Sequence, residues 1–296
     1  MRVLLTGANS FVGRTVAETL SQEGHEVAGT YRSDDGRLEP LKALDNFSLF
    51  RVELAQISSF DTLPQSFDAV IHCAAASSHV GLSYDEYISG NVLSTSNTAQ
   101  FARSAGARKF VFLSTLSVHG DIEDTEVTAA TPSRNPNLYG ISKLFCERLL
   151  FDQADDLPSI AIRLPAVLGR GAHRSWLPGL ADRINRKLPI SIYNASAPFN
   201  NAVLASDVSK FCSHLLKQDL VGHAALPIAA SGLIKIRDVI RLMFEGMETT
   251  VEVTEHPAPG KSFIVSSREA IDGYGYAPSH IEDIVVQFAQ SARFST

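Results

Sequence analysis

Tyr139 and Lys143 stand four residues apart in the run NLYGISKLFCERLL, whose apolar spacing is typical of an amphipathic helix. Residues i and i+4 share one face of a helix, so the phenol and the ammonium group would point into the same space. A phenol has an ordinary pKa of ~10 and is a poor base at neutral pH. A nearby positive charge favours the phenolate and lowers that pKa, so Tyr139 could exchange a proton with a hydroxyl or carbonyl group.

Hydroxyl side chains end a predicted strand upstream of this pair, in the run FVFLSTLSVHG. Ligands of parallel sheets bind at the carboxyl ends of strands, where Ser114 and Thr115 are expected. A hydroxyl there could hydrogen-bond the same substrate oxygen that Tyr139 protonates. Without this support, Tyr139 and Lys143 would fit equally well an ordinary helix with one packed and one solvated side chain.

The chain opens with MRVLLTGANSFVG, in which Gly7, Ser10 and Gly13 have the spacing of a dinucleotide-binding loop. The loop follows a strand-like run and precedes a helical one, and backbone N–H groups at a helix N-terminus bind phosphate. Ser10 replaces the middle glycine, so its Cβ takes up space, whereas its hydroxyl could donate to a phosphate oxygen. The alternative is a structural turn with two glycines.

Strand-like and helical runs alternate through the first half of the chain. The strands are RVLLT, HEVAGT, FSLFRV, DAVIHCA, KFVFLST and SIAIRLP, and the longer helices are expected at 11–23, 84–105 and 138–154. This alternation predicts an α/β fold, a Rossmann-type doubly wound parallel sheet with a smaller C-terminal substrate-binding lobe. We expect one domain at 1–169 and the lobe mainly at 170–296, with some segments returning to the first domain.

Composition excludes several classes of protein. A formal net charge of -6 argues against nucleic acid or a membrane surface as a partner. Cys73, Cys146 and Cys212 are far apart and predict neither disulfides nor a metal site. The chain shows no signal peptide and no apolar run of membrane-spanning length, so we expect a cytoplasmic protein.

Several motifs together resemble the extended short-chain dehydrogenase/reductases, the NAD(P)-dependent epimerase/dehydratase family of sugar-nucleotide enzymes. They are TGANSFVG, DAVIHCAA, NVLSTSN, YGISK and IRLPAVLG. The resemblance implies that residues 1–169 bind NAD(P) and that Thr115, Tyr139 and Lys143 are catalytic. It also implies cofactor contacts at Gly7, Ser10, Phe11, Val12, Gly13, Tyr31, Arg32, Glu53, Leu54, Cys73, Ala74, Ala75, Ala76, Asn91, Tyr139, Lys143 and Pro165.

The end of the second strand, GTYRSDD, bears on the choice of cofactor. An acidic residue there would bind the ribose 2′-hydroxyl of NAD, whereas Arg32 could bind the 2′-phosphate of NADP. NADP is therefore favoured, and Asp34 and Asp35 keep NAD possible.

Use of NADP favours reduction of a carbonyl, above all a nucleotide-linked 4-keto sugar, with Tyr139 as the proton donor. An NAD-retaining sugar-nucleotide epimerase is the alternative, and a non-catalytic NADP-binding sensor is a further one. Leu116 and Ser117 stand where dehydratases of the family carry an acidic pair, which argues against dehydration.

Two features bear on partners. Asn200 and Ala258 stand where the family's diphosphate-binding arginines are expected, which weakens the nucleotide-sugar assignment. Arg170, His173, Arg174 and Lys261 are possible replacements, although each also fits a solvated loop. The helices at 84–105 and 138–154 are candidates for a homodimer contact, and burial on the chain's own sheet explains their apolar faces equally well.

Overall fold

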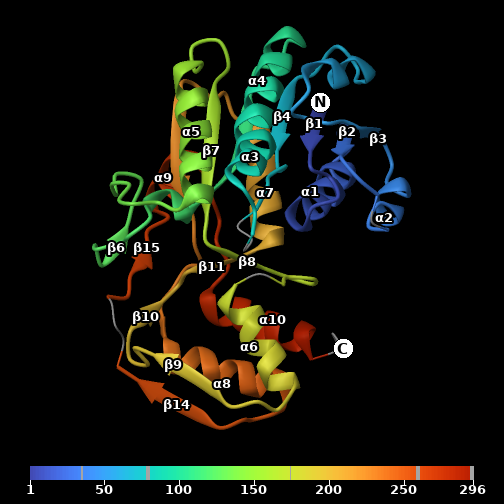
Figure 1. Ribbon diagram of the computed structural model, residues 1–296. Coiled ribbons are helices and arrows are strands. Elements are labelled where there is room, and N and C mark those ends of the chain that lie inside the picture. The colour runs from blue at the N-terminus through green and yellow to red at the C-terminus, as the bar shows by residue number, and fades with distance from the viewer. Residues whose placement is uncertain (35, 78–80, 174, 258–260, 294–296) are drawn as a thin grey trace. The chain divides into compact units, whose positions relative to one another are not determined.

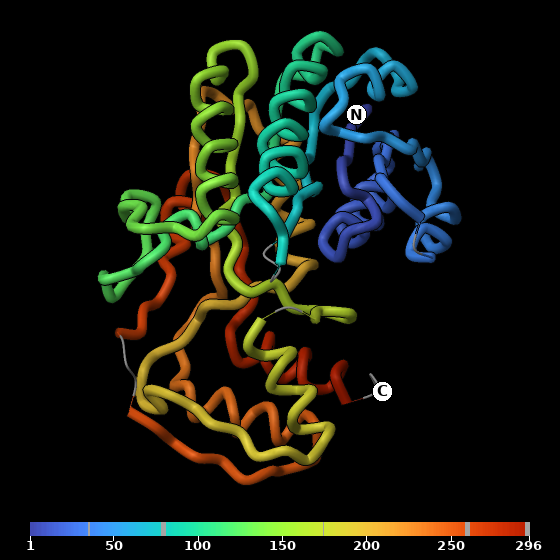
Figure 2. Tube along the Cα trace, viewed as in Figure 1, coloured from blue at the N-terminus to red at the C-terminus, as the bar shows by residue number. Residues whose placement is uncertain are grey.

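The computed structural model describes residues 1–34, 36–77, 81–173, 175–257 and 261–293. The chain forms two compact units, which are drawn in Figures 1 and 2. Unit 1 comprises 1–121, 132–163 and 208–226, and unit 2 comprises 122–131, 164–207 and 227–296.

A seven-stranded sheet forms the centre of unit 1. Its order is β12-β7-β5-β4-β1-β2-β3, with strands at β1 Arg2–Thr6, β2 Glu26–Tyr31, β3 Phe47–Arg51, β4 Ala69–His72, β5 Phe110–Thr115, β7 Ser159–Leu164 and β12 His223–Pro227. β1 pairs in parallel with β2 and β4, β2 with β3, and β4 with β5. Strand order reverses direction at β1 and β4, which is the Rossmann arrangement, so the predicted fold class is confirmed.

Helices cover both faces of this sheet (Figure 1). One face carries α1 (Phe11–Gln22) and α7 (Ala205–Leu216), which are joined by a hydrogen bond between Thr19 and Ser209. The other face carries α5 (Leu138–Asp152) beside a helical stretch made of α3 (Tyr84–Tyr87), the π-helical turn η2 (Ile88–Leu93) and α4 (Ser94–Ser104). Short elements complete the unit: α2 Glu39–Lys42, η1 Ile57–Thr62 and η3 Leu116–His119.

Apolar strand residues explain why the sheet forms. Phe110 and Phe112 of β5 are fully buried and belong to one core with Cys146 and Leu150 of α5. Continuous apolar runs of this kind are expected where a parallel sheet is covered on both faces. The carboxyl ends of β1, β4 and β5 are thereby held side by side, and Gly7, Cys73 and Thr115 stand at those ends.

Unit 2 is built from short paired strands and helices around its own core. Its strands are β6 Glu126–Val127, β8 Ala166–Leu168, β9 Ile190–Tyr193, β10 Pro198–Phe199, β11 Ala202–Leu204, β13 Ile234–Lys235, β14 Val253–His256 and β15 Ile264–Val265. Its helices are α6 Trp176–Asn185, α8 Ile236–Met247, α9 Arg268–Tyr274 and α10 Ile281–Ala292. α8 packs along α10, and Val239, Met243, Ile284 and Val285 are fully buried in the core that they share.

Three further observations concern the described residues alone. None of their helices is long and apolar enough to cross a membrane. Cys73, Cys146 and Cys212 are buried and carry free thiols. Within the same ranges, no three His, Cys, Asp or Glu side chains gather in a way that could hold a metal ion.

Candidate active site

The turn between β1 and α1 brings the backbones of Gly7 and Gly13 together. Gly7 has a φ of +66°, and a Cβ on it would lie 2.7 Å from the backbone of Ala74. A Cβ on Gly13 would lie 2.1 Å from the carbonyl oxygen of Gly7. Both contacts are closer than a carbon atom can approach, so the turn needs glycine at both positions.

Ser10 fits this loop because its backbone is extended, with a φ of -70° and a ψ of 163°. Its hydroxyl oxygen accepts a hydrogen bond from the N–H of Gly13 and caps α1. Phe11 and Val12 begin the helix, where N–H groups have no acceptor within the helix. A tight turn with a capped helix N-terminus fits the pyrophosphate of a dinucleotide.

The segment after β2 lies close to this loop. Asn9 donates from its side chain to the carbonyl oxygen of Ser33 across 3.1 Å. Tyr31 ends the strand and Arg32 follows it with an exposed side chain. The carboxylate of Asp34 accepts from the N–H of Gly36 within its own turn, and Asp35 lies outside the described residues.

Two more predicted cofactor segments are held by side-chain bonds to the backbone. Leu54, which follows Glu53 after β3, accepts from the side chain of Asn97 across 2.9 Å. The segment 73–76, Cys73-Ala74-Ala75-Ala76, follows β4, and Asn91 accepts from the N–H of Ala76 across 2.8 Å. Asn91 also donates to the Ala76 carbonyl and to the hydroxyl of Ser142 on α5.

The position of Asn91 depends on the π-helical turn η2, which interrupts the helix expected at 84–105. Gly90 in this turn approaches Ala76 so closely that a Cβ would lie 2.8 Å from the Ala76 side chain. Single π-helical turns often occur at functional sites. This one joins the segment after β4 to the helix that carries Tyr139 and Lys143.

The Thr115 side chain lies near the Tyr139 phenol and lowers the Tyr139 pKa as a hydrogen-bond partner. Thr115 ends β5 and also accepts from the N–H of Ser117, which caps η3. Tyr139 lies in the first turn of α5, where a Cβ on Gly140 would lie 2.1 Å from the Ser117 carbonyl oxygen. The glycine after the tyrosine therefore allows α5 to begin directly against η3 and brings the phenol to the threonine.

Burial raises the pKa of Tyr139 to about 12, against the lowering effect of the Thr115 hydrogen bond. The direction is opposite to the lowering expected from Lys143. The Tyr87 ring is one of the groups that surround Tyr139, with its centroid 6.2 Å from that of the Tyr139 ring. In the protein alone Tyr139 therefore remains protonated at neutral pH, and its use as a base requires additional positive charge beside it.

Lys143 is buried one turn further along α5, with its Nζ 4.0 Å from the centre of the Phe112 ring. Burial lowers the pKa of Lys143 to about 8, while Cys146, Glu147 and Cys73 oppose the shift. The spacing of the catalytic pair predicted from the sequence thus places both side chains on one face of α5. Because Lys143 is buried, its ammonium group loses a proton more easily than that of an exposed lysine.

Sequence reasoning did not single out Glu147, which lies one turn beyond Lys143 on the same face. Its carboxylate accepts from Ser114, and it pairs with Arg163 of β7 across 2.8 Å. Ser114 is therefore directed to Glu147, and of the two strand-end hydroxyls it is Thr115 that contacts Tyr139. The spacing Tyr-x3-Lys-x3-Glu was the signal in the sequence that pointed to this third residue.

The residues considered for a diphosphate lie in unit 2. Asn200 is buried and both donates to and accepts from the backbone of Val265, so it holds the fold together. Arg170, His173 and Lys261 are exposed, and Arg174 and Ala258 lie outside the described residues. Pro165 joins β7 to β8 and is assigned to unit 2, whereas Thr115, Tyr139 and Lys143 belong to unit 1.

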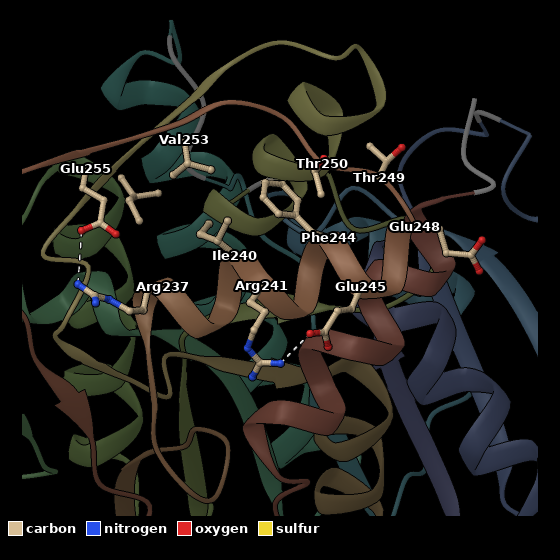
Figure 3. Close-up of a pocket in the computed structure, with 11 residues that line it drawn as sticks. Arg237, Ile240, Arg241, Phe244, Glu245, Glu248, Thr249, Thr250, Val253 and Glu255 are labelled. Carbon is tan, nitrogen blue, oxygen red and sulfur yellow. Dashed lines mark hydrogen bonds and ion pairs between the residues drawn. The ribbon is translucent and has the colours of Figure 1, made fainter.

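A separate cavity of about 640 Å³ lies in unit 2 between α8 and the strands β9 and β14 (Figure 3). Its floor consists of isoleucine, valine and phenylalanine side chains. Both of its arginines are paired, at 3.4 Å and 2.8 Å: Arg237 with Glu255, and Arg241 with Glu245. None of the site residues predicted from the sequence lines this cavity.

Comparison with known families covers the part of the chain that contains these residues. Residues 3–226 match the model of the NAD dependent epimerase/dehydratase family. The chain belongs to this family. The resemblance to this family stated from the sequence is confirmed, and the matched range contains the glycine loop, Asn91, Thr115, Tyr139 and Lys143.

Similar proteins in this family include UDP-glucose 4-epimerase of Streptomyces lividans. It is 26% identical over 97% of this chain and 94% of its own length. Among solved structures, UDP-glucuronic acid 4-epimerase of Bacillus cereus in complex with NAD has a TM-score of 0.84 at 19% identity, covering 99% of this chain and 98% of its own. UDP-glucose 4-epimerase of Thermus thermophilus, also in complex with NAD, has a TM-score of 0.79 at 22% identity, covering all of both chains.

These relatives overturn the preference for carbonyl reduction over epimerisation. The relative from Streptomyces lividans, which matches over nearly its whole length, is a 4-epimerase, so the alternative given from the sequence is the better one. The preference rests on Arg32 as a sign of NADP. This residue bears on cofactor binding and does not decide whether a hydride returns to the same carbon. The solved neighbours carry NAD, and the preference for NADP finds no support in them.

Proposed function

We propose that this protein is an NAD-dependent 4-epimerase acting on a nucleoside-diphosphate sugar. The observation that carries the proposal is the contact between Thr115 and Tyr139, one helical turn from the buried Lys143, in a chain that matches a UDP-glucose 4-epimerase over 97% of its length. The reaction inverts one carbon of the sugar without net oxidation. It therefore needs a proton acceptor that also gives the proton back.

Tyr139 is the group proposed for that proton. A bound nicotinamide would supply a reversible hydride acceptor and a positive charge beside the phenol. Tyr139 then takes the proton of the sugar 4-hydroxyl at its phenolic oxygen and later returns it to the carbonyl oxygen. Thr115 holds the phenol in place, and the charge of the nicotinamide together with the ammonium of Lys143 would favour the phenolate against the effect of burial.

The cofactor residues proposed are those of the glycine loop, the segment 73–76 and Lys143. Gly7 and Gly13 allow the tight turn before α1, and the start of α1 offers its free N–H groups to a pyrophosphate. NAD is proposed rather than NADP because an epimerase returns the hydride in every cycle, and because the solved neighbours carry NAD. Unit 2 is proposed to bind the sugar nucleotide.

A homodimer is proposed on the exposed apolar surface of α5 and the neighbouring helical stretch. Ile141 and Phe145 of α5 are 50% and 56% exposed, and Ile88 and Leu93 of η2 are 48% and 43% exposed. The helices that carry them lie side by side (Figure 2). Exposed apolar side chains gathered on neighbouring helices often mark a protein–protein interface.

The first test identifies the nucleotide released when the purified protein is denatured, and then measures turnover of UDP-glucose, UDP-galactose and UDP-glucuronate by NMR. We expect bound NAD and interconversion at C4 with no net consumption of cofactor. Tyr139→Phe should lose at least a hundredfold in kcat while still binding NAD. An empty site, together with steady oxidation of NADPH by a carbonyl compound, would contradict the proposal.

A further inference from the structure

A buried ion pair lies beneath the helix that carries Tyr139 and Lys143. The Glu147 carboxylate on α5 is bound by the Arg163 guanidinium from β7, with Nη2 2.8 Å and Nε 3.2 Å away. The two side chains are only 5% and 11% exposed. Ser114 of β5 donates its hydroxyl to the same carboxylate across 2.5 Å. One carboxylate thus joins α5 to two strands of the central sheet.

Stability alone does not account for such a pair. Removing two charges from water costs several kcal/mol per ion, and well-packed apolar side chains often stabilise a protein at least as well. The surroundings offer that alternative, because Phe112, Cys146 and Leu150 form an apolar core beside it. A buried pair does, however, impose a direction and a distance on the elements it joins, which apolar contacts do not.

Two alignments make this direction relevant to the site. Tyr139, Lys143 and Glu147 follow one another at intervals of four residues, so they lie along one face of α5. Ser114 directly precedes Thr115 in β5. The bond from Ser114 to Glu147 therefore ties the helix of Tyr139 and Lys143 to the strand end of Thr115.

We propose that Glu147, held by Arg163 and Ser114, is a positioning residue that sets the register of α5 on β5 and so aligns Tyr139 and Lys143 with Thr115. The proposal rests on the proposed function in naming the proton transfer that depends on this alignment. A neighbouring contact extends the network, since Nη1 of Arg163 lies 3.5 Å from Nε2 of the buried His119. The charge of Glu147 also opposes the lowering of the Lys143 pKa by burial.

Ser114→Ala is the sharpest variant, because it cuts the link to β5 and leaves the ion pair intact. A matched control exists on the other face of the sheet: buried Ser213 donates its hydroxyl to the carboxylate of Glu23 across 2.6 Å. Both variants remove one hydroxyl from a bond between a buried serine and a glutamate, and Glu23 is 32% exposed where Glu147 is 5% exposed. Only Ser114 lies beside the predicted catalytic residues, so a loss of stability common to both variants is separated from misalignment.

We expect Ser114→Ala to lower kcat at least tenfold, with KM and the dissociation constant of NAD within twofold of the wild type. Ser213→Ala should keep the kcat of the wild type while unfolding at a similarly reduced urea concentration. A wild-type kcat in Ser114→Ala would overturn the proposal. So would an equal loss of kcat in both variants, because general destabilisation would then explain it.

A second measurement separates this proposal from the proposed function. The protein is labelled with 3-fluorotyrosine and loaded with NAD, and the ¹⁹F signal of Tyr139 is assigned by its absence in Tyr139→Phe. We expect Ser114→Ala to shift this signal and Ser213→Ala to leave it unchanged. If the wild type epimerises no UDP-sugar, the shift still supports the positioning role. An unshifted signal in Ser114→Ala overturns it.

Discussion

The hydroxyl oxygen of Ser10 accepts a hydrogen bond from the backbone N–H of Gly13 across 3.0 Å. The side chain that replaces the middle glycine of the loop is therefore the N-cap of α1. Its Cβ is accommodated because the backbone at Ser10 is extended, whereas Gly7 and Gly13 border backbone atoms directly. The substitution adds a capping interaction and leaves the two necessary glycines in place.

Removing this cap should destabilise the protein modestly. We expect Ser10→Ala to lower the free energy of unfolding by ~1 kcal/mol, and Ser10→Gly by only a few tenths of that. Urea denaturation followed by circular dichroism measures both variants. Equal stability of Ser10→Ala and the wild type would mean that the cap contributes nothing.

A Cβ added at Gly13 should disturb the loop far more than a Cβ added at a glycine in an open part of a helix disturbs that helix. The new atom would lie 2.1 Å from the Gly7 carbonyl oxygen, so the turn must open. We expect Gly13→Ala to weaken NAD binding at least tenfold by isothermal titration calorimetry. Gly179→Ala in α6 is the control, because nothing lies within 4 Å of its added Cβ. Undiminished NAD affinity in Gly13→Ala would be incompatible with the role given to this loop.

The buried Lys143 should make stability depend on pH in a defined window. Its pKa is about 8 in the folded protein and 10.5 as the ordinary value, so between these two pH values the unfolded chain binds more protons than the folded one. The contribution of Lys143 to the free energy of unfolding therefore rises as the pH increases from about 8 to about 10, by at most ~3 kcal/mol.

Lys143→Met isolates this contribution. We expect the nucleotide-free variant to be more stable than the wild type at pH 7, with the advantage shrinking as pH rises through the window. The measurement is urea denaturation of both proteins at several pH values. A difference in stability that stays constant from pH 7 to 10 would show that the lysine is not titrating there.

The proposed dimer surface predicts a change of mass in solution. Phe145→Glu places a carboxylate in the centre of the exposed apolar surface, and we expect it to convert a dimer into a monomer in light scattering. Val221→Glu is the control, because this residue is 87% exposed in the turn before β12. A wild-type protein that is already monomeric at micromolar concentration would contradict the dimer.

Much of the site follows from local patterns. The turn from β1 to α1, and the four-residue spacing of Tyr139 and Lys143, depend on glycines and helical periodicity that a sequence displays directly. The π-helical turn does not, because Asn91 reaches its place through bonds to Ala76 and Ser142, which are distant in sequence. The direction of the Tyr139 pKa shift was also beyond the sequence, since it depends on how deeply the phenol is buried, and burial outweighs the lowering effect of Thr115.

The choice of reaction was missed for a different reason. Arg32 and Asn200 could be read as signs of NADP and of an altered substrate, yet Asn200 proves to be a buried link to Val265. Reduction and epimerisation use the same threonine, tyrosine and lysine. The residues that separate the two reactions govern retention of the cofactor and movement of the substrate, and no short motif records them.

The chain passes between its two units five times, after residues 121, 131, 163, 207 and 226. Neither unit is a continuous stretch, and the edge strand β12 of the Rossmann sheet follows more than forty residues assigned to the other unit. On the ribosome, the nucleotide-binding half therefore cannot add the last strand of its sheet, β12, until about three quarters of the polypeptide has been made. A gene fragment ending near residue 169 would encode an open-edged sheet prone to aggregation, and not a cofactor-binding module that could be transplanted.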